Sequence, residues 1–253
     1  MIEKWLDPYE LKARILPGLI IVFPILIDAL YILPVLSSWP IFAASGACGF
    51  ALVYGLGHLA RSLGEGTEGK LWASWGGPPS TRFIRCRDTF FGHRLKAQIR
   101  NSLGTELSLS LACEDEEAAN PIGADKQIED AFRRVREYLR ANDPQGLWHS
   151  HNIEYGFSRN LLGCRWVWAI VALVGTTVAV LYGAWTGGGP ANPGSVMNLV
   201  ALVSALYLGW AVLPRATEHV ADNYAEAAWL AFLRKSEEST NNSLPKGVAP
   251  NGV

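Results

Sequence analysis

Residues 166–185 have the sequence WVWAIVALVGTTVAVLYGAW, an apolar run with tryptophan at both ends. A helix needs about 20 such residues to cross the hydrocarbon core of a bilayer, which is roughly 30 Å thick. Tryptophan is enriched at the membrane–water interface because its ring is amphipathic. The run therefore predicts a transmembrane helix over residues 166–185.

Three further apolar runs have the same character and cover residues 15–36, 40–59 and 196–213. Short connections without any charged residue join the four runs in pairs, at residues 37–39 and 186–195. The sequence therefore predicts a mainly α membrane protein with four transmembrane helices in two hairpins. The polar stretch between the hairpins predicts a small α or α+β domain.

Lysine and arginine are distributed unevenly along the chain. Three precede the first run, fifteen lie between the second and third runs, and four follow the fourth run. Cytoplasmic segments carry the excess of basic residues, so both termini and the middle domain are predicted to be cytoplasmic. The predicted parts are a tail and hairpin (1–60), a cytoplasmic domain (61–165), a second hairpin (166–213), an amphipathic helix (214–238) and a disordered tail (239–253).

Asp28 is the only ionisable residue deep inside a predicted span. A charge at that depth costs several kcal/mol unless it is hydrated, paired or protonated. Pro24, four residues earlier, leaves a helical carbonyl without its usual donor. We predict that Asp28 lines a pore. The alternative is a protonated acid, or one bonded to a polar side chain of the fourth span: Asn198, Ser204 or Tyr207.

Small residues recur in three of the spans. Lipid gives helices no hydrophobic reason to associate, so close approach of two helices depends on such residues. The stripes pack either within one bundle or between subunits around a shared axis. They comprise Ala43, Ala47, Ala51 and Gly55, then Gly175, Ala179 and Gly183, and finally Ala201, Ala205 and Gly209.

The middle domain contains a candidate anion site. Residues 71–81 read LWASWGGPPST and are followed by three arginines. Thr81 is predicted to cap a helix over residues 82–88, whose N-terminus beside arginines suits an anion, while a tryptophan stacks a base. The alternative is headgroup anchoring by the tryptophans, with the arginines on anionic lipid. The predicted ligand-binding residues are Trp75, Gly76, Gly77, Arg82, Arg85 and Arg87.

Other segments carry weaker signals. Residues 125–140 and 217–235 have the apolar periodicity of amphipathic helices. Residues 61–70 are predicted to be a flexible exit from the second span, and residues 114–117 a solvated acidic loop. A hydrogen-bonded collar at the membrane surface is predicted for Asn152, Glu154, Tyr155, Arg159 and Asn160.

Motifs of catalysis or cofactor binding are missing from the sequence. No HExxH, GxSxG, P-loop or Rossmann pattern occurs, and the HxH pair of His149 and His151 is too small a set for a metal without a further ligand such as Glu154. We therefore predict a protein that is not an enzyme and holds no cofactor or metal.

Three blocks carry a family resemblance: DPYELKAR at 7–14 followed by Leu16-Pro17, KLWASWGGPP at 70–79 with Arg85 and Asp88, and YGFSRNLLG at 155–163. They resemble uncharacterised bacterial inner-membrane proteins that are similar to membrane effectors of phage-defence operons, in particular the Hailong-type effector. The resemblance implies a homotetrameric channel of the inner membrane, held shut by single-stranded DNA oligomers or a nucleotide ligand from a partner nucleotidyltransferase. The resemblance does not assign any ligand-binding residue in this sequence.

The resulting prediction is a homo-oligomeric effector in which a nucleic-acid or nucleotide ligand on residues 61–165 controls a pore, so that opening depolarises the infected cell. Two alternatives stay open. One is a scaffolding membrane protein that recruits a soluble partner, and the other is a membrane enzyme that acts at the headgroup level.

Overall fold

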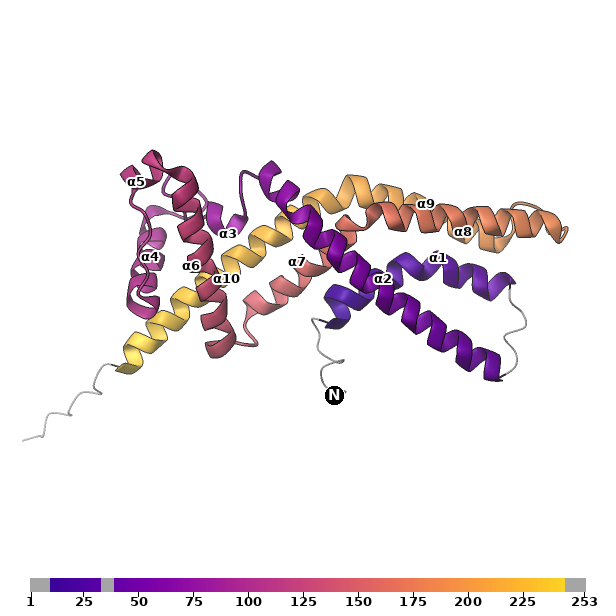
Figure 1. Cartoon of the computed structure of the whole chain (residues 1–253), viewed down its shortest axis with the longest axis horizontal. Helices are drawn as coiled ribbons and strands as arrows, with labels where there is room; N and C mark the ends of the chain where they lie inside the picture. The colour runs from indigo at the N-terminus through magenta and orange to yellow at the C-terminus, as the bar shows by residue number, and fades with distance from the viewer. Residues whose placement is uncertain (1–9, 33–38, 244–253) are drawn as a thin grey trace, which may run out of the picture. The chain divides into compact units, whose positions relative to one another are not determined.

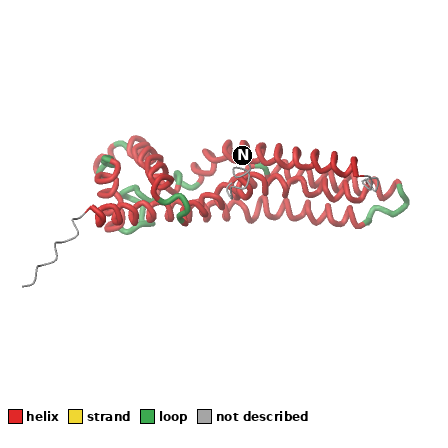
Figure 2. The backbone as a smooth tube through the Cα atoms, turned by 90° about the horizontal axis from the view of Figure 1, so that it is seen from below, coloured by secondary structure: helices red, strands yellow, loops and turns green. Residues whose placement is uncertain are grey.

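The structure is a computed structural model that describes residues 10–32 and 39–243. These residues form helices and loops and include no strand (Figure 2), so the prediction of a mainly α protein is confirmed. The chain divides into two compact units. Unit 1 comprises residues 1–71 and 152–220, and unit 2 comprises residues 72–151 and 221–253.

Unit 1 is a set of long apolar helices. Within it α8 and α9 lie side by side along their lengths, and α1 packs on both of them (Figure 1). Its elements are η1 (Glu10–Ile15), α1 (Leu16–Ile32), most of α2 (Trp39–Ser74), most of α7 (Leu147–Gly163), α8 (Arg165–Trp185), α9 (Pro193–Tyr207), η3 (Leu208–Val212) and the start of α10 (Leu213–Ser243).

The α8–α9 hairpin is closed by an ordered turn. Asn192 caps α9 by accepting the backbone N–H of Ser195 (3.0 Å), and its Nδ2 donates to the carbonyl of Ala179 on α8 (2.8 Å). Gly183 lies directly against Asn192 and the carbonyl of Gly189, so a Cβ at residue 183 would collide with both. The uncharged connection predicted at residues 186–195 is thus a tight hairpin turn.

Large apolar side chains of α8 and α9 face outward, whereas small ones face inward. Leu181 and Val200 are 64% and 60% exposed, while Ala172 and Ala205 are fully buried. A soluble core has the reverse arrangement, whereas helices in lipid pack through small residues. By length and composition, residues 165–185 and 193–240 can each cross a membrane, and the apolar stretch Leu16–Ala29 is shorter. Four spans remain a prediction.

The three small-residue stripes do not all pack in the same way. Gly175, Ala179 and Gly183 are all buried on α8, and a Cβ on Gly209 would lie 3.2 Å from Cβ of Arg165. These stripes therefore pack within the chain.

The stripe on α2 does not pack in this way at its described positions. Ala51 and Gly55 are exposed, and a Cβ on Gly55 would meet nothing within 4 Å. The structure does not describe the side chains of Ala43 and Ala47. Instead, α2 approaches α1 through another face, where Gly18 lies against Gly57 and the carbonyl of Val53.

The flexible exit predicted for residues 61–70 is wrong, because α2 continues as a helix to Ser74. Glycines at 64, 66 and 69 disfavour a helix by local propensity, but tertiary contacts override propensity. Arg61 and Glu65 form an i,i+4 ion pair (2.7 Å), and Glu68 bonds to α7.

Unit 2 is built around α4 (His93–Leu107), α6 (Pro121–Asn142) and residues 221–243 of α10, with the short helices α3 (Pro79–Arg82) and α5 (Glu114–Ala119) packed on α6. The indole Nε1 of Trp229 donates to the carbonyl of Ser80 (2.9 Å). The fully buried side chains of unit 2 include residues from all three long helices: Ile99, Leu103, Ile128, Val135, Leu139, Trp229 and Phe232.

Both amphipathic helices predicted from periodicity are confirmed and run longer than predicted. In α6, Asn120 caps the N-terminus by accepting the N–H of Gly123 (3.0 Å), and Pro121 occupies the first turn. Helix α10 reaches Ser243, so residues 239–243, predicted to be disordered, are helical. Residues 244–253 of that predicted tail lie outside the described residues.

Residues 114–117 are not the predicted solvated loop but the first turns of α5. Glu116 Oε2 accepts the backbone N–H of Cys113 (2.9 Å) as part of a capping box. Glu117 is only 3% exposed, because its carboxylate is directed to the loop that follows α3.

Candidate functional site

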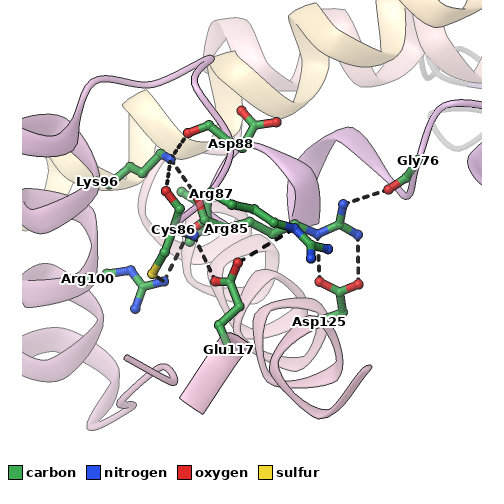
Figure 3. Close-up of polar contacts among 10 residues, drawn as sticks. Gly76, Arg85, Cys86, Arg87, Asp88, Lys96, Arg100, Glu117 and Asp125 are labelled. Atoms are coloured by element: carbon green, nitrogen blue, oxygen red, sulfur yellow. Dashed lines mark hydrogen bonds and ion pairs between the residues drawn. The ribbon is translucent and has the colours of Figure 1, made fainter. Parts of the chain in front are cut away.

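The loop between α3 and α4, residues 83–92, is held by basic side chains of α4 (Figure 3). The ammonium group of Lys96 is buried and donates to the carbonyls of Arg85 (2.6 Å), Cys86 (3.3 Å) and Asp88. Three acceptors satisfy its three protons, which makes a buried lysine tolerable. The sequence did not predict this role for Lys96.

Arg100 and Glu117 complete the support of this loop. Arg100 donates to the carbonyls of Ala112 (2.7 Å) and Ile84 (3.2 Å), while Glu117 Oε2 accepts the N–H of Cys86 (2.8 Å). Burial raises the pKa of the Cys86 thiol; Arg100 lowers it and Glu117 raises it further. Hydrogen bonds to Lys96, Arg100 and Glu117 therefore fix the conformation of this loop.

Arg85, predicted to bind a ligand, lies against the Gly76-Gly77 turn, and an acid already neutralises its charge. Its Nε and Nη2 donate to the two oxygens of Asp125 (2.7 Å each), and its Nη1 donates to the carbonyl of Gly76 (2.7 Å). Gly77 has φ of 122°, and a Cβ there would lie 2.5 Å from Nη2 of Arg85. Only glycine suits both the backbone and the guanidinium at this position.

Arg82 is engaged in the same manner. Its Nη1 donates to the carbonyl of Trp75 (2.9 Å), and its Nη2 donates to Oδ1 of Asp222 on α10 (2.9 Å). The structure thus brings Trp75 and Arg82 together by a backbone contact and not by ring stacking. The charges of Arg82 and Arg85 stabilise unit 2 internally, and an anionic ligand would have to compete with their carboxylates.

Arg87 differs from the other two arginines. Its side chain is 59% exposed and its Nε is 4.0 Å from Oε1 of Glu117, an oxygen that accepts no hydrogen bond among the described residues. Of the three predicted arginines, Arg87 is therefore the one most able to meet an external anion.

The helix cap predicted at Thr81 is wrong. Helix α3 begins at Pro79 with Pro78 as its N-cap and ends at Arg82, so Thr81 lies inside it. Proline is favoured in the first turn, where its missing N–H costs nothing. The predicted helix over residues 82–88 is instead mostly the loop that Lys96 holds.

Asp28 contacts α8 and α9 within the chain. Its Oδ1 accepts a hydrogen bond from Nδ2 of Asn198 (2.6 Å), and its Oδ2 would lie 3.2 Å from a Cβ on Gly175. Asn198 is fully buried, and its own Oδ1 has no partner among the described residues. This geometry matches the hydrogen-bonded alternative, and pore lining by Asp28 stays a prediction.

Three of the predicted collar residues, Tyr155, Arg159 and Asn160, form hydrogen bonds that join α7 to α2 and η1. Arg159 Nη1 and the hydroxyl of Tyr155 both donate to Oε1 of Glu68 on α2 (2.6 and 3.0 Å). Asn160 accepts from Arg159 (3.1 and 3.2 Å) and donates to the carbonyl of Ala13 in η1 (2.8 Å). The sequence missed Glu68 because residues 61–70 were predicted to be flexible.

The described residues contain no group of three or more His, Cys, Asp or Glu that could hold a metal ion. Compared with known proteins, the chain matches no protein-family model, no curated protein and no solved structure.

Proposed function

We propose that this chain is an oligomeric membrane effector of anti-phage defence. Unit 1 forms a gated ion pathway through the bacterial inner membrane, and unit 2 receives a nucleic-acid or nucleotide ligand on the cytoplasmic side. The observation that carries the membrane part is the outward apolar surface of α8 and α9. The defence role and the ligand class rest on the resemblance of the three sequence blocks.

The dimensions of α8 support insertion. Trp166 and Trp185 stand near its ends and are 62% and 84% exposed. At 1.5 Å per residue, the 19 steps between them span about 28 Å, close to the hydrocarbon thickness. Arg165 lies beside the ring of Trp210, 5.1 Å from its centroid, which suits a cation at the headgroup level.

The connections between the units support gating. Each of the three passes between unit 1 and unit 2 falls inside a helix, namely α2, α7 and α10. Within unit 1, Glu68–Arg159 ties α2 to α7, and the hydroxyls of Ser158 and Thr217, 2.7 Å apart, tie α7 to α10. Asn160 on α7 also donates a hydrogen bond to η1, and η1 leads into α1. We infer that movement of these helices transmits ligand occupancy to the spans.

Flux measurements test the proposal. The purified full-length chain is reconstituted into liposomes that hold a fluorescent potassium indicator, with and without single-stranded DNA oligomers. We expect flux without oligomer and suppression with it. An Arg159→Ala variant should still conduct but should lose the dependence on oligomer. No flux above empty liposomes in any condition would refute a channel.

A scaffolding protein that conducts nothing is the second candidate. The observation that favours it is the internal pairing of Arg82, Arg85 and Asp28, each of which is engaged within the chain. In that case liposomes stay sealed while a soluble partner binds unit 2. The same flux measurement therefore separates the two candidates.

A further inference from the structure

Arg165, the first residue of α8, carries a charge that no described residue neutralises. Its guanidinium lies over the ring of Trp210 in η3, 5.1 Å from the ring centroid. Within the described part of the chain, its side chain forms no ion pair and donates no hydrogen bond. Two other arginines of unit 1, Arg61 and Arg159, both pair with glutamates. The five N–H groups of Arg165 are therefore left for an acceptor outside the described residues.

The groups around Arg165 are aromatic rings and hydrogen-bond donors. The rings of Trp166 and Trp210 meet edge to face, with their centroids 4.7 Å apart, and neither indole N–H has an acceptor among the residues that the structure describes. The sequence from residue 155 to residue 217 contains no aspartate or glutamate, so neither helix repels an anion at this level. A guanidinium beside further N–H donors suits a phosphate, whose oxygens accept all of these bonds.

The backbone brings Trp210 against the start of α8. Trp210 lies in η3, a π-helical turn between α9 and α10, and single π turns inside helices are frequent at functional sites. The preceding residue, Gly209, is buried, and a Cβ on it would lie 3.2 Å from Cβ of Arg165. Glycine thus allows the close approach that sets the indole of the next residue over the guanidinium.

Exposed apolar side chains extend from this cluster along both helices, which lie side by side (Figure 1). Trp166, Ile170 and Leu173 on α8 are each more than half exposed, and so are Val203 and Tyr207 on α9. Residues three and four apart share one helix face, so each set forms a stripe. A soluble anion would contact only the end of the stripes, whereas the acyl chains of a phospholipid would lie along them.

We propose that Arg165 and the indole N–H groups of Trp166 and Trp210 bind the phosphate of an anionic phospholipid, whose acyl chains lie along α8 and α9. This inference rests on the membrane part of the proposed function and adds a defined lipid as a ligand of unit 1. The site is on the predicted cytoplasmic side, where anionic lipids give the membrane a negative surface potential. A zwitterionic lipid binds less tightly, because its own cation already neutralises the phosphate.

Native mass spectrometry of the full chain in detergent tests the site by counting bound lipids. The probes are phosphatidylglycerol, phosphatidylcholine with the same acyl chains, and glycerol phosphate, which has the anionic head without the chains. We expect phosphatidylglycerol to bind about fivefold more tightly than phosphatidylcholine. Glycerol phosphate should not displace it, because the apolar stripes contribute to binding.

Arg165→Gln should abolish the preference for phosphatidylglycerol and leave phosphatidylcholine binding unchanged. Arg165→Lys is the second variant: it keeps a cation but loses the planar fork that binds phosphate through two parallel bonds, so part of the preference should be lost. Arg61→Gln is the matched control. Arg61 is also a partly exposed arginine of unit 1, but Glu65 already pairs with it, so its loss should leave the preference unchanged.

Equal binding of the two lipids by the parent chain would overturn the proposal. A preference that persists in both Arg165 variants, or that Arg61→Gln reduces as much, would also overturn it, because basic residues in general would then attract the lipid. Displacement by glycerol phosphate would overturn the lipid as the ligand in favour of a soluble anion. Each of these results leaves the channel to be decided separately by liposome flux.

Discussion

Arg159 on α7 and Glu68 on α2 form a short ion pair (2.6 Å) in which both side chains are largely buried, at 12% and 19% exposure. The same carboxylate oxygen of Glu68 also accepts the hydroxyl of Tyr155. A pair this far from solvent is stabilising only while both partners are present, because removal of one leaves the other charge unpaired. Substitution of either residue alone should therefore destabilise unit 1.

Glu68→Ala should lower the free energy of unfolding by about 2–3 kcal/mol, because Arg159 would then be desolvated without a partner. Arg159→Ala should cost a similar amount, and the double variant less than the sum, in chemical unfolding followed by tryptophan fluorescence. Lys126→Ala is the control, since Lys126 and Asp130 form an exposed i,i+4 pair worth about 0.3–0.5 kcal/mol. Additive losses for Glu68 and Arg159 would show that the pair is not coupled.

Gly64→Ala should destabilise the α2–α7 contact, whereas Gly66→Ala should stabilise the chain. A Cβ at Gly64 would lie 2.5 Å from Oδ1 and 2.8 Å from Cα of Asn160, while a Cβ at Gly66 would meet nothing within 4 Å. At residue 66, where a Cβ has room, alanine should stabilise the helix by about 0.5–1 kcal/mol relative to glycine. Thermal unfolding of the two variants should shift the midpoint in opposite directions, and equal shifts would contradict this account of α2.

Arg85→Ala should destabilise unit 2 by about 3 kcal/mol, because it breaks three hydrogen bonds and leaves Asp125 unpaired. Arg87→Ala should change stability by less than about 0.5 kcal/mol, since its side chain is largely exposed. If Arg87 meets phosphates, its loss should weaken oligonucleotide binding and reduce the salt dependence by about one unit of slope. Arg133→Ala, which is similarly exposed, should alter neither property.

Asp28→Asn tests the two roles of this acid. An amide preserves the contact with Asn198, so stability should change little, while Asp28→Val should destabilise by about 1–3 kcal/mol because Asn198 is fully buried. If Asp28 also lines the pore, Asn at this position should reduce cation conductance and selectivity in planar bilayers. Unchanged single-channel conductance would remove Asp28 from the pore and leave it as a tie between α1 and α9.

Cys86 should react with iodoacetamide more slowly than Cys113 at pH 8. Burial raises the pKa of the Cys86 thiol, so at this pH a smaller fraction is present as the reactive thiolate. Cys113 is exposed and provides the internal comparison in a mass-spectrometric time course. Faster labelling of Cys86 would mean that the loop held by Lys96 and Arg100 opens readily.

Helices with strong local signals could be predicted from the amino-acid sequence. The apolar run at 166–185 became α8, and the periodicity at 125–140 and 217–235 became parts of α6 and α10. Such patterns are readable because residues three and four apart share one helix face, whatever the rest of the chain does. The collar was predictable in part for the same reason, since Tyr155, Arg159 and Asn160 lie close together on one helix.

Which charged side chains form ion pairs depends on contacts between segments that are distant in the sequence. The partners of Arg85 and Arg82 lie 40 and 140 residues away, at Asp125 and Asp222, so no local pattern reveals that the predicted anion site is already paired. Contacts with α7 likewise make residues 61–70 helical against the propensity of their glycines. Ion pairs and close backbone approaches between distant segments depend on the folded positions of both partners, and local sequence contains only one of them.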